Sequence, residues 1–142
     1  MNYYALFFHV PLKYLSYTMP YPEYNIALIG AAATGKTAFM RFLKGLSLET
    51  IKNNKYHSTP HTIVHPIDHK RHLFNIWEAG KFSKVEEFPN ISVVILITKG
   101  TNPVMPSLPG NPPIVVVNNR KHVMTAVDAY SALDKVIDII HH

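Results

Sequence analysis

The clearest chemistry in this chain lies in eight consecutive residues: Gly30, Ala31, Ala32, Ala33, Thr34, Gly35, Lys36 and Thr37. Two glycines four residues apart, followed by lysine and threonine, are typical of a loop that binds phosphate. The turn lets backbone N–H groups point at phosphate oxygens, and a following helix adds the positive end of its dipole. Lys36 can reach the β- and γ-phosphates of a nucleotide, and the Thr37 hydroxyl can hold Mg²⁺.

A loop of this kind needs a strand before it and a helix after it, and the sequence predicts both. Residues 25–29 are an apolar run typical of a strand, and residues 36–44 have the pattern of a helix that Gly45 can end. The alternative is a chance turn that contains glycine and lysine. The flanking elements favour the phosphate-binding interpretation.

Strands follow the loop. Residues 62–65 and 72–77 are predicted to be two short strands, joined through residues 68–71. Residues 91–98 (ISVVILIT) are apolar on both faces, as expected for a covered parallel strand, and residues 113–117 are a second such strand. The pattern predicts a three-layer α/β fold whose mostly parallel sheet has one antiparallel edge strand. A ligand is expected at the carboxyl ends of the parallel strands.

A last helix is predicted over residues 126–140, with Thr125 as its cap. Asp128 and Asp134 are expected on its surface. Apolar side chains form a stripe along one face of this helix, as in a helix packed on a core: Ala126, Ala129, Tyr130, Leu133, Val136, Ile137 and Ile140.

The length of 142 residues suits one domain. We assign residues 24–142 to this domain and residues 1–23 to an aromatic-rich N-terminal extension. Hydrophobic residues make up 47% and charged residues 16%, which excludes a disordered composition.

The formal charge of +5 favours phosphate-bearing ligands or acidic partners, but it is too modest and scattered to indicate nucleic-acid binding. There is no cysteine, so disulfides, thiolate metal sites and cysteine-linked lipid anchors are excluded. No apolar run near the start is long enough to cross a membrane, and no signal peptide is evident. The expected location is intracellular and cytoplasmic.

Residues 25–42 resemble the first strand, phosphate loop and first helix of the Ras/Rab-like small GTPases. Residues 56–59 are similar to the family's switch I, residues 75–81 to the strand that enters switch II, and residues 115–120 to its base-recognition segment. The resemblance implies a small G-protein-like P-loop NTPase fold that binds GTP or GDP with Mg²⁺. It also implies that Thr37 and Thr59 hold the metal.

The switch II segment departs from the family pattern. Trp77-Glu78-Ala79-Gly80-Lys81 is one residue shorter than the family's W-D-T-A-G-Q. Glu78 is a candidate for the aspartate linked to Mg²⁺, and Gly80 is a candidate switch residue. Lys81 replaces the glutamine that positions water. Because lysine accepts no hydrogen bond, GTP hydrolysis should be at most slow.

The base-recognition segment departs as well. Asn119 is kept, Arg120 replaces the family's lysine, and His122 stands where its aspartate belongs. A carboxylate accepts two guanine N–H bonds, which neutral imidazole cannot reproduce. Asn119 and Arg120 are therefore candidate base-binding residues with weakened preference for guanine.

One or two of the family's helices are expected to be missing. Residues 99–113 are too short and too rich in proline to form a helix after strand 91–98. Too few residues separate the base segment from the last helix to hold another strand and helix. The apolar strand 91–97 then needs cover from the N-terminal extension or from a partner.

Histidines recur at near-regular intervals: His57, His61, His65, His69 and His72. On a strand, His61 and His65 would share a face and form a metal-binding pair. With no cysteine and no clear carboxylate partner, a solvated strand face and hairpin is the favoured interpretation.

Three functions are compatible with these features. The first is a reduced Rab/Ras-like GTP-binding protein that acts mainly through nucleotide-dependent protein contacts. The second is a pseudo-GTPase that serves as an interaction component of an assembly, such as a viral particle, without nucleotide turnover. The third is a true NTPase or small-molecule kinase. A kinase needs a lid and an acceptor site, and this chain has no room for them.

Overall fold

The computed structural model describes residues 21–31, 34–45, 62–80, 88–100, 107–120 and 123–142. Their helices and strands follow in the order β1 (Glu23–Ile29), α2 (Lys36–Leu43), β2 (Ile63–His69), β3 (His72–Glu78), β4 (Val93–Thr98), β5 (Ile114–Asn118) and α4 (Ala126–Ile140).

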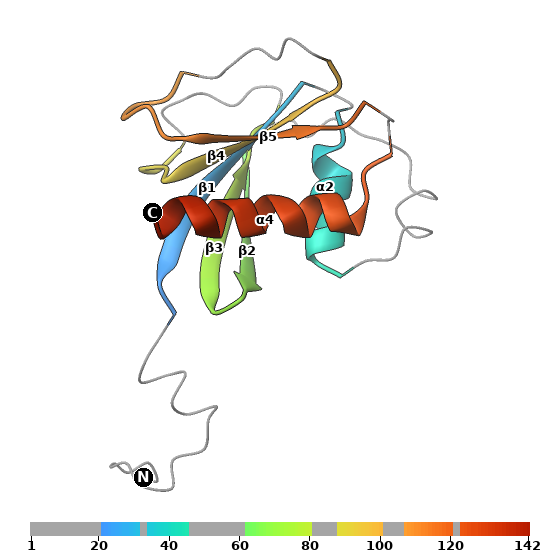
Figure 1. Cartoon of the computed structure of the whole chain (residues 1–142). Helices are drawn as coiled ribbons and strands as arrows, with labels where there is room; N and C mark the ends of the chain where they lie inside the picture. The colour runs from blue at the N-terminus through green and yellow to red at the C-terminus, as the bar shows by residue number, and fades with distance from the viewer. Residues whose placement is uncertain (1–20, 32–33, 46–61, 81–87, 101–106, 121–122) are drawn as a thin grey trace, which may run out of the picture.

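The five strands form one sheet in the order β2-β3-β1-β4-β5 (Figure 1). β1 lies in the centre and pairs in parallel with β3 and β4, while β5 pairs in parallel with β4. Only β2, at one edge, is antiparallel to its neighbour β3. The structure thus confirms the predicted α/β class, with a mostly parallel sheet and one antiparallel edge strand.

Both described helices cover the same face of this sheet. Figure 1 shows α4 crossing in front of the strands, with α2 beside its N-terminal end. Phe39 and Met40 of α2 and Leu133 and Val136 of α4 pack into one core with strand residues such as Ile95. Burying large apolar side chains in this way supplies the main driving force of folding.

The last helix begins and ends where it was predicted. The Thr125 hydroxyl accepts a bond from the Asp128 N–H, and the Asp128 carboxylate accepts one from the Thr125 N–H, which completes a capping box. The predicted stripe faces the core except for Tyr130, which is 37% exposed. The Tyr130 hydroxyl donates to the Phe42 carbonyl and so joins α4 to α2.

The hairpin is longer than predicted, because β2 continues through Pro66 to His69. Proline is tolerated there because β2 is an edge strand. His69 pairs with His72, which leaves only Lys70 and Arg71 in the turn, at φ values of 47° and 63°. A two-residue turn with both residues at positive φ matches the right-handed twist of the strands it joins.

The opposite face of the sheet carries a smaller apolar cluster: Ala27, Ile91, Val94 and Leu108, with Ile29, Trp77, Phe88 and Ile114 packed against it. Neither of the two helices in the described residues packs on this face. A covering layer on this face, from the N-terminal extension or from a partner, is not seen among the described residues and stays a prediction.

As for membrane insertion, neither α2 nor α4, the helices of the described ranges, has the length and apolar character needed to cross a bilayer.

Candidate functional site

The predicted phosphate loop lies between the end of β1 and the start of α2, at the carboxyl ends of the parallel strands. Gly30, its first residue, packs tightly against β4. A Cβ atom at Gly30 would lie 2.6 Å from the Ile97 carbonyl oxygen and 2.7 Å from the Thr34 hydroxyl oxygen. Glycine is therefore required at this position by close backbone approach.

Two contacts close the loop on itself. The Lys36 ammonium donates to the carbonyl oxygen of Gly30, six residues earlier. The Thr34 hydroxyl donates to the Ala31 carbonyl at 2.8 Å, and the Thr34 N–H reaches the same oxygen at 3.3 Å. The lysine side chain consequently folds back toward the first residue of the loop. Ala32 and Ala33 lie outside the described residues.

Asn119 connects the loop to the end of β5, an edge strand of the sheet. It follows β5 directly, is 6% exposed, and donates from Nδ2 to the Thr34 carbonyl at 2.9 Å. Its backbone N–H reaches the Thr98 carbonyl at 2.6 Å. Gly35, at φ 110°, makes room for this contact, since a Cβ there would lie 2.8 Å from Asn119 Nδ2. The predicted phosphate and base segments thus meet at one place.

The N-terminus of α2 carries no side-chain cap, and its first turn holds no acidic residue. The first N–H groups of a helix lack partners within the helix, and the helix dipole places partial positive charge on them. Thr37, the predicted Mg²⁺ ligand, is half-buried in this first turn. This end of α2 is therefore suited to an anion.

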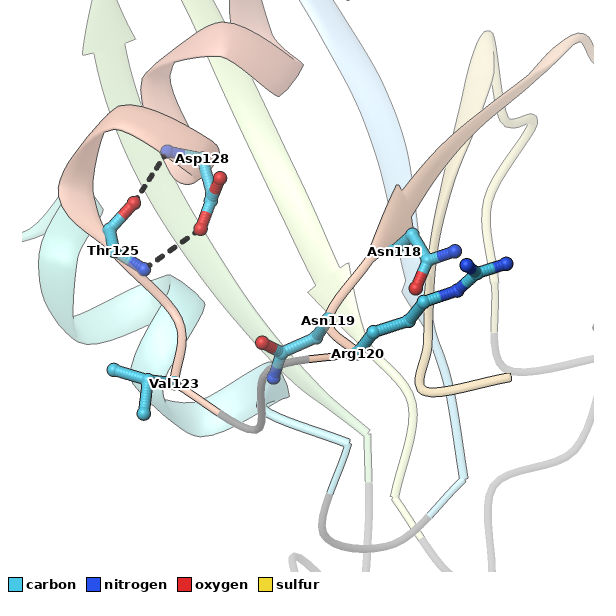
Figure 2. A pocket seen from close by; sticks show the side chains of 6 residues that line it. All are labelled: Asn118, Asn119, Arg120, Val123, Thr125 and Asp128. Atoms are coloured by element: carbon cyan, nitrogen blue, oxygen red, sulfur yellow. Dashed lines mark hydrogen bonds between the residues drawn. The ribbon is translucent and has the colours of Figure 1, made fainter. Parts of the chain in front are cut away.

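A cavity of about 400 Å³ opens beside the loop (Figure 2). Its lining residues are Asn118, Asn119, Arg120, Val123, Thr125 and Asp128. In Figure 2, Asn119 lies between the exposed Arg120 side chain and the Thr125–Asp128 capping box. A cavity of this size can take a small planar ligand.

Both predicted base-binding residues therefore line one cavity. Asn119 is held by the loop, whereas Arg120 is exposed and carries the cationic group. Thr125 and Asp128, which the sequence indicated only as helix cap and helix surface, also line it. The signal that could have placed them here is the short distance in sequence between the base segment and the α4 cap.

A buried acid–imidazole pair lies at the end of β3. Glu78 is 4% exposed and His65 is 9% exposed, and Glu78 Oε1 lies 3.0 Å from His65 Nε2. Glu78 Oε2 is buried and has no hydrogen-bond partner among the described residues. The solvated strand face expected for the histidines is therefore wrong for His65. Its side chain points to the core side of β2, where it meets Glu78 of the neighbouring strand.

Several predicted site residues cannot be placed. Thr59, Lys81 and His122 lie outside the described residues, whereas Gly80 directly follows Ala79, whose N–H donates to the Leu28 carbonyl of β1. Within the described ranges, no three histidine, aspartate or glutamate side chains gather as a metal-binding group.

Comparison with models of protein families gave no match, and comparison with curated protein sequences gave none either. The proposals below accordingly rest on the residues and their geometry.

Proposed function

We propose that this chain binds a guanine nucleotide with Mg²⁺ at the loop of residues 30–37, as a reduced Rab/Ras-like GTP-binding protein. The observation that carries the proposal is the junction of Asn119 Nδ2 with the Thr34 carbonyl. It joins a loop of phosphate-binding sequence to a cavity that Arg120 also lines. The residues predicted to bind phosphate and base are thereby adjacent, and this supports the proposal because one nucleotide would need both.

In this proposal the phosphates lie against the loop backbone and the N-terminus of α2, and Lys36 exchanges its contact with the Gly30 carbonyl for a phosphate oxygen. The unpartnered Glu78 Oε2 and the Thr37 hydroxyl are oxygen groups of the kind Mg²⁺ accepts. Thr59 would be the further metal ligand. The metal would neutralise phosphate charge.

Turnover is proposed to be slow or absent, because Lys81 stands where the family has its glutamine. The base site is proposed to be of relaxed specificity, since Asn119 Nδ2 already donates to the loop and Arg120 offers only donors. The protein would then act mainly through nucleotide-dependent contacts with a protein partner, in an intracellular and cytoplasmic setting.

The test is binding of fluorescent GTP, GDP and ATP analogues with and without Mg²⁺. Lys36→Ala should weaken binding at least tenfold, whereas Lys44→Ala, an exposed lysine at the other end of α2, should leave it within twofold. Each variant removes one lysine charge at an end of the same helix, so the second is a matched control for the first. Absence of binding at millimolar nucleotide, or equal loss in both variants, would overturn the proposal.

A second candidate is a pseudo-GTPase that serves as an interaction component of an assembly. The favouring observation is the helix-free face within the described residues, where Ile29, Trp77, Phe88 and Ile114 are only partly buried. Partly covered apolar side chains of this kind mark protein interfaces. Copurification in a stable complex that GTP, GDP and EDTA leave unchanged would support this candidate over the nucleotide switch.

A further inference from the structure

Two histidines from distant parts of the chain meet at the end of the sheet opposite the loop. His72 begins β3, next to the hairpin turn, and His141 is the C-cap of α4. Their Nε2 atoms lie 2.8 Å apart, and the ring planes cross at 72° with centroids 5.1 Å apart. Both side chains are accessible to solvent, so a small ion can reach the two nitrogens.

The other nitrogen of His72 determines what its Nε2 can do. His72 Nδ1 lies 2.7 Å from the Lys70 carbonyl oxygen, which only accepts hydrogen bonds. Nδ1 therefore carries the proton, and in the neutral ring Nε2 presents a lone pair. A backbone carbonyl that orients a ring through Nδ1–H is the usual support of a metal-binding histidine.

The hairpin that carries His72 is fixed in place. Asp134 of α4 accepts from His69 Nε2 at 3.0 Å and from Lys70 Nζ at 2.8 Å. The His72 ring also stacks on Phe74 with an interplanar angle of 5° and a centroid distance of 5.8 Å. Contacts of the neighbouring residues and the Phe74 stack thus help to hold the His72 ring in place beside His141.

We propose that His72 and His141 form a two-imidazole site for a divalent transition-metal ion, which fastens the β2–β3 hairpin to the C-terminus of α4. Metal–nitrogen bonds of about 2.0 Å that meet at a right angle place the nitrogens about 2.8 Å apart, whereas a tetrahedral angle places them about 3.3 Å apart. The observed 2.8 Å, which in the metal-free pair is the length of the hydrogen bond, is closer to the right-angle value. Square-planar or tetragonal coordination by nitrogen is the preference of Cu²⁺ and Ni²⁺.

Binding needs a change of tautomer and a turn of both rings, because the lone pair of His72 Nε2 now points at His141 Nε2. In the metal-free pair, His141 Nε2–H donates to His72 Nε2. On binding, the proton of His141 moves to its Nδ1, so that both Nε2 lone pairs face the ion, and water completes the coordination. The nearby Lys70 charge is offset by its pair with Asp134. Because the ion binds the folded arrangement, it should stabilise the protein in proportion to its affinity.

The experiment is titration of the full chain with Cu²⁺, followed by calorimetry and by electron paramagnetic resonance. The spectrum should show two imidazole nitrogens on Cu²⁺ in the wild type and one in His72→Phe, which keeps the stack on Phe74. His72→Phe and His141→Ala should each weaken Cu²⁺ binding at least tenfold. His142→Ala, the adjacent exposed histidine, should change it less than twofold.

The double variant His72→Phe/His141→Ala distinguishes one shared site from two separate ones. If both side chains hold one ion, the double variant should lose less affinity than the two single losses combined. Affinity within twofold of wild type in His72→Phe would show that the C-terminal histidines bind alone and would overturn the proposal. Additive losses, or absence of a Cu²⁺-dependent rise in melting temperature, would overturn it as well.

Discussion

The two ends of the sheet are held together by different kinds of contact. At the carboxyl end, the loop is held by side chains that bond to backbone, as Lys36 does to the Gly30 carbonyl and Asn119 to the Thr34 carbonyl. At the amino end, side chains bond to one another, as His69 and Lys70 do to Asp134. Contacts to backbone fix the shape of a loop, whereas exposed pairs of ionisable side chains respond to protons and metal ions. The carboxyl end is therefore suited to a binding site of fixed geometry. The contacts at the amino end can change with pH or with metal-ion concentration.

The largest effect is expected at the buried pair of His65 and Glu78, at the carboxyl end of β3. His65→Ala leaves the buried Glu78 carboxylate without its partner and should cost about 3 kcal/mol of unfolding free energy, measured by urea denaturation. His69→Ala, which breaks a pair at the exposed end, should cost less than about 1 kcal/mol.

The double variant His65→Ala/Glu78→Gln should recover part of this loss, because the uncompensated charge is gone. Equal costs for His65→Ala and His69→Ala would contradict the distinction between a buried and an exposed pair.

Alanine substitution at two glycines with positive φ can distinguish the cost of backbone strain from the cost of a close contact. Gly35→Ala meets both a left-handed conformation and Asn119 Nδ2 at 2.8 Å, so it should cost about 2–3 kcal/mol. Gly45→Ala, at φ 84° with no atom within 4 Å of its new Cβ, should cost only about 1 kcal/mol. Thermal and urea unfolding of both variants measure the difference. If Gly45→Ala cost as much as Gly35→Ala, backbone strain alone would account for the loss of stability in both variants.

The junction between loop and base cavity is tested by two neighbouring asparagines. Asn119→Ala leaves the Thr34 carbonyl without its donor and should cost about 1–3 kcal/mol, with weaker nucleotide binding. Asn118→Ala, at an exposed position, should change stability by less than about 0.5 kcal/mol. Nucleotide binding that survives Asn119→Ala unchanged would separate the loop from the cavity in function.

The smallest effect is expected at Asp134. The Lys70 and His69 side chains that bond to this carboxylate lower its pKa below the usual 3.8. Its contribution is therefore present above pH of roughly 4 and lost as the pH falls through the lower folded-state pKa. Because the pair is exposed, Asp134→Asn should cost less than about 1 kcal/mol at pH 7. Urea unfolding of both proteins from pH 7 to pH 2 should show the difference vanish in acid. A constant difference would assign the effect to packing.

Features that depend on residues close together in the sequence were predictable from the sequence. The α4 limits followed from apolar periodicity and the Thr125 cap, and the loop followed from its glycine spacing. Pairing across strands was not, because it depends on register. His65 meets Glu78 because the hairpin register pairs Ile63 with Glu78 and His65 with Ile76. The same holds for Asp128, whose place beside the cavity depends on how α4 packs.

The position of β1 has a consequence for synthesis of the chain. Of the strands in the described residues, β1 is made first, yet its hydrogen-bonding neighbours β3 and β4 end at residues 78 and 98. At about 5–20 residues per second, its two edges wait on the order of several seconds after residue 29 is made. During that time Ile26, Ala27 and Leu28, which become the centre of the molecule, have no partner strand. The yield of folded protein should therefore depend on translation rate and chaperone supply. It should depend on them more strongly than on the stability of the folded state.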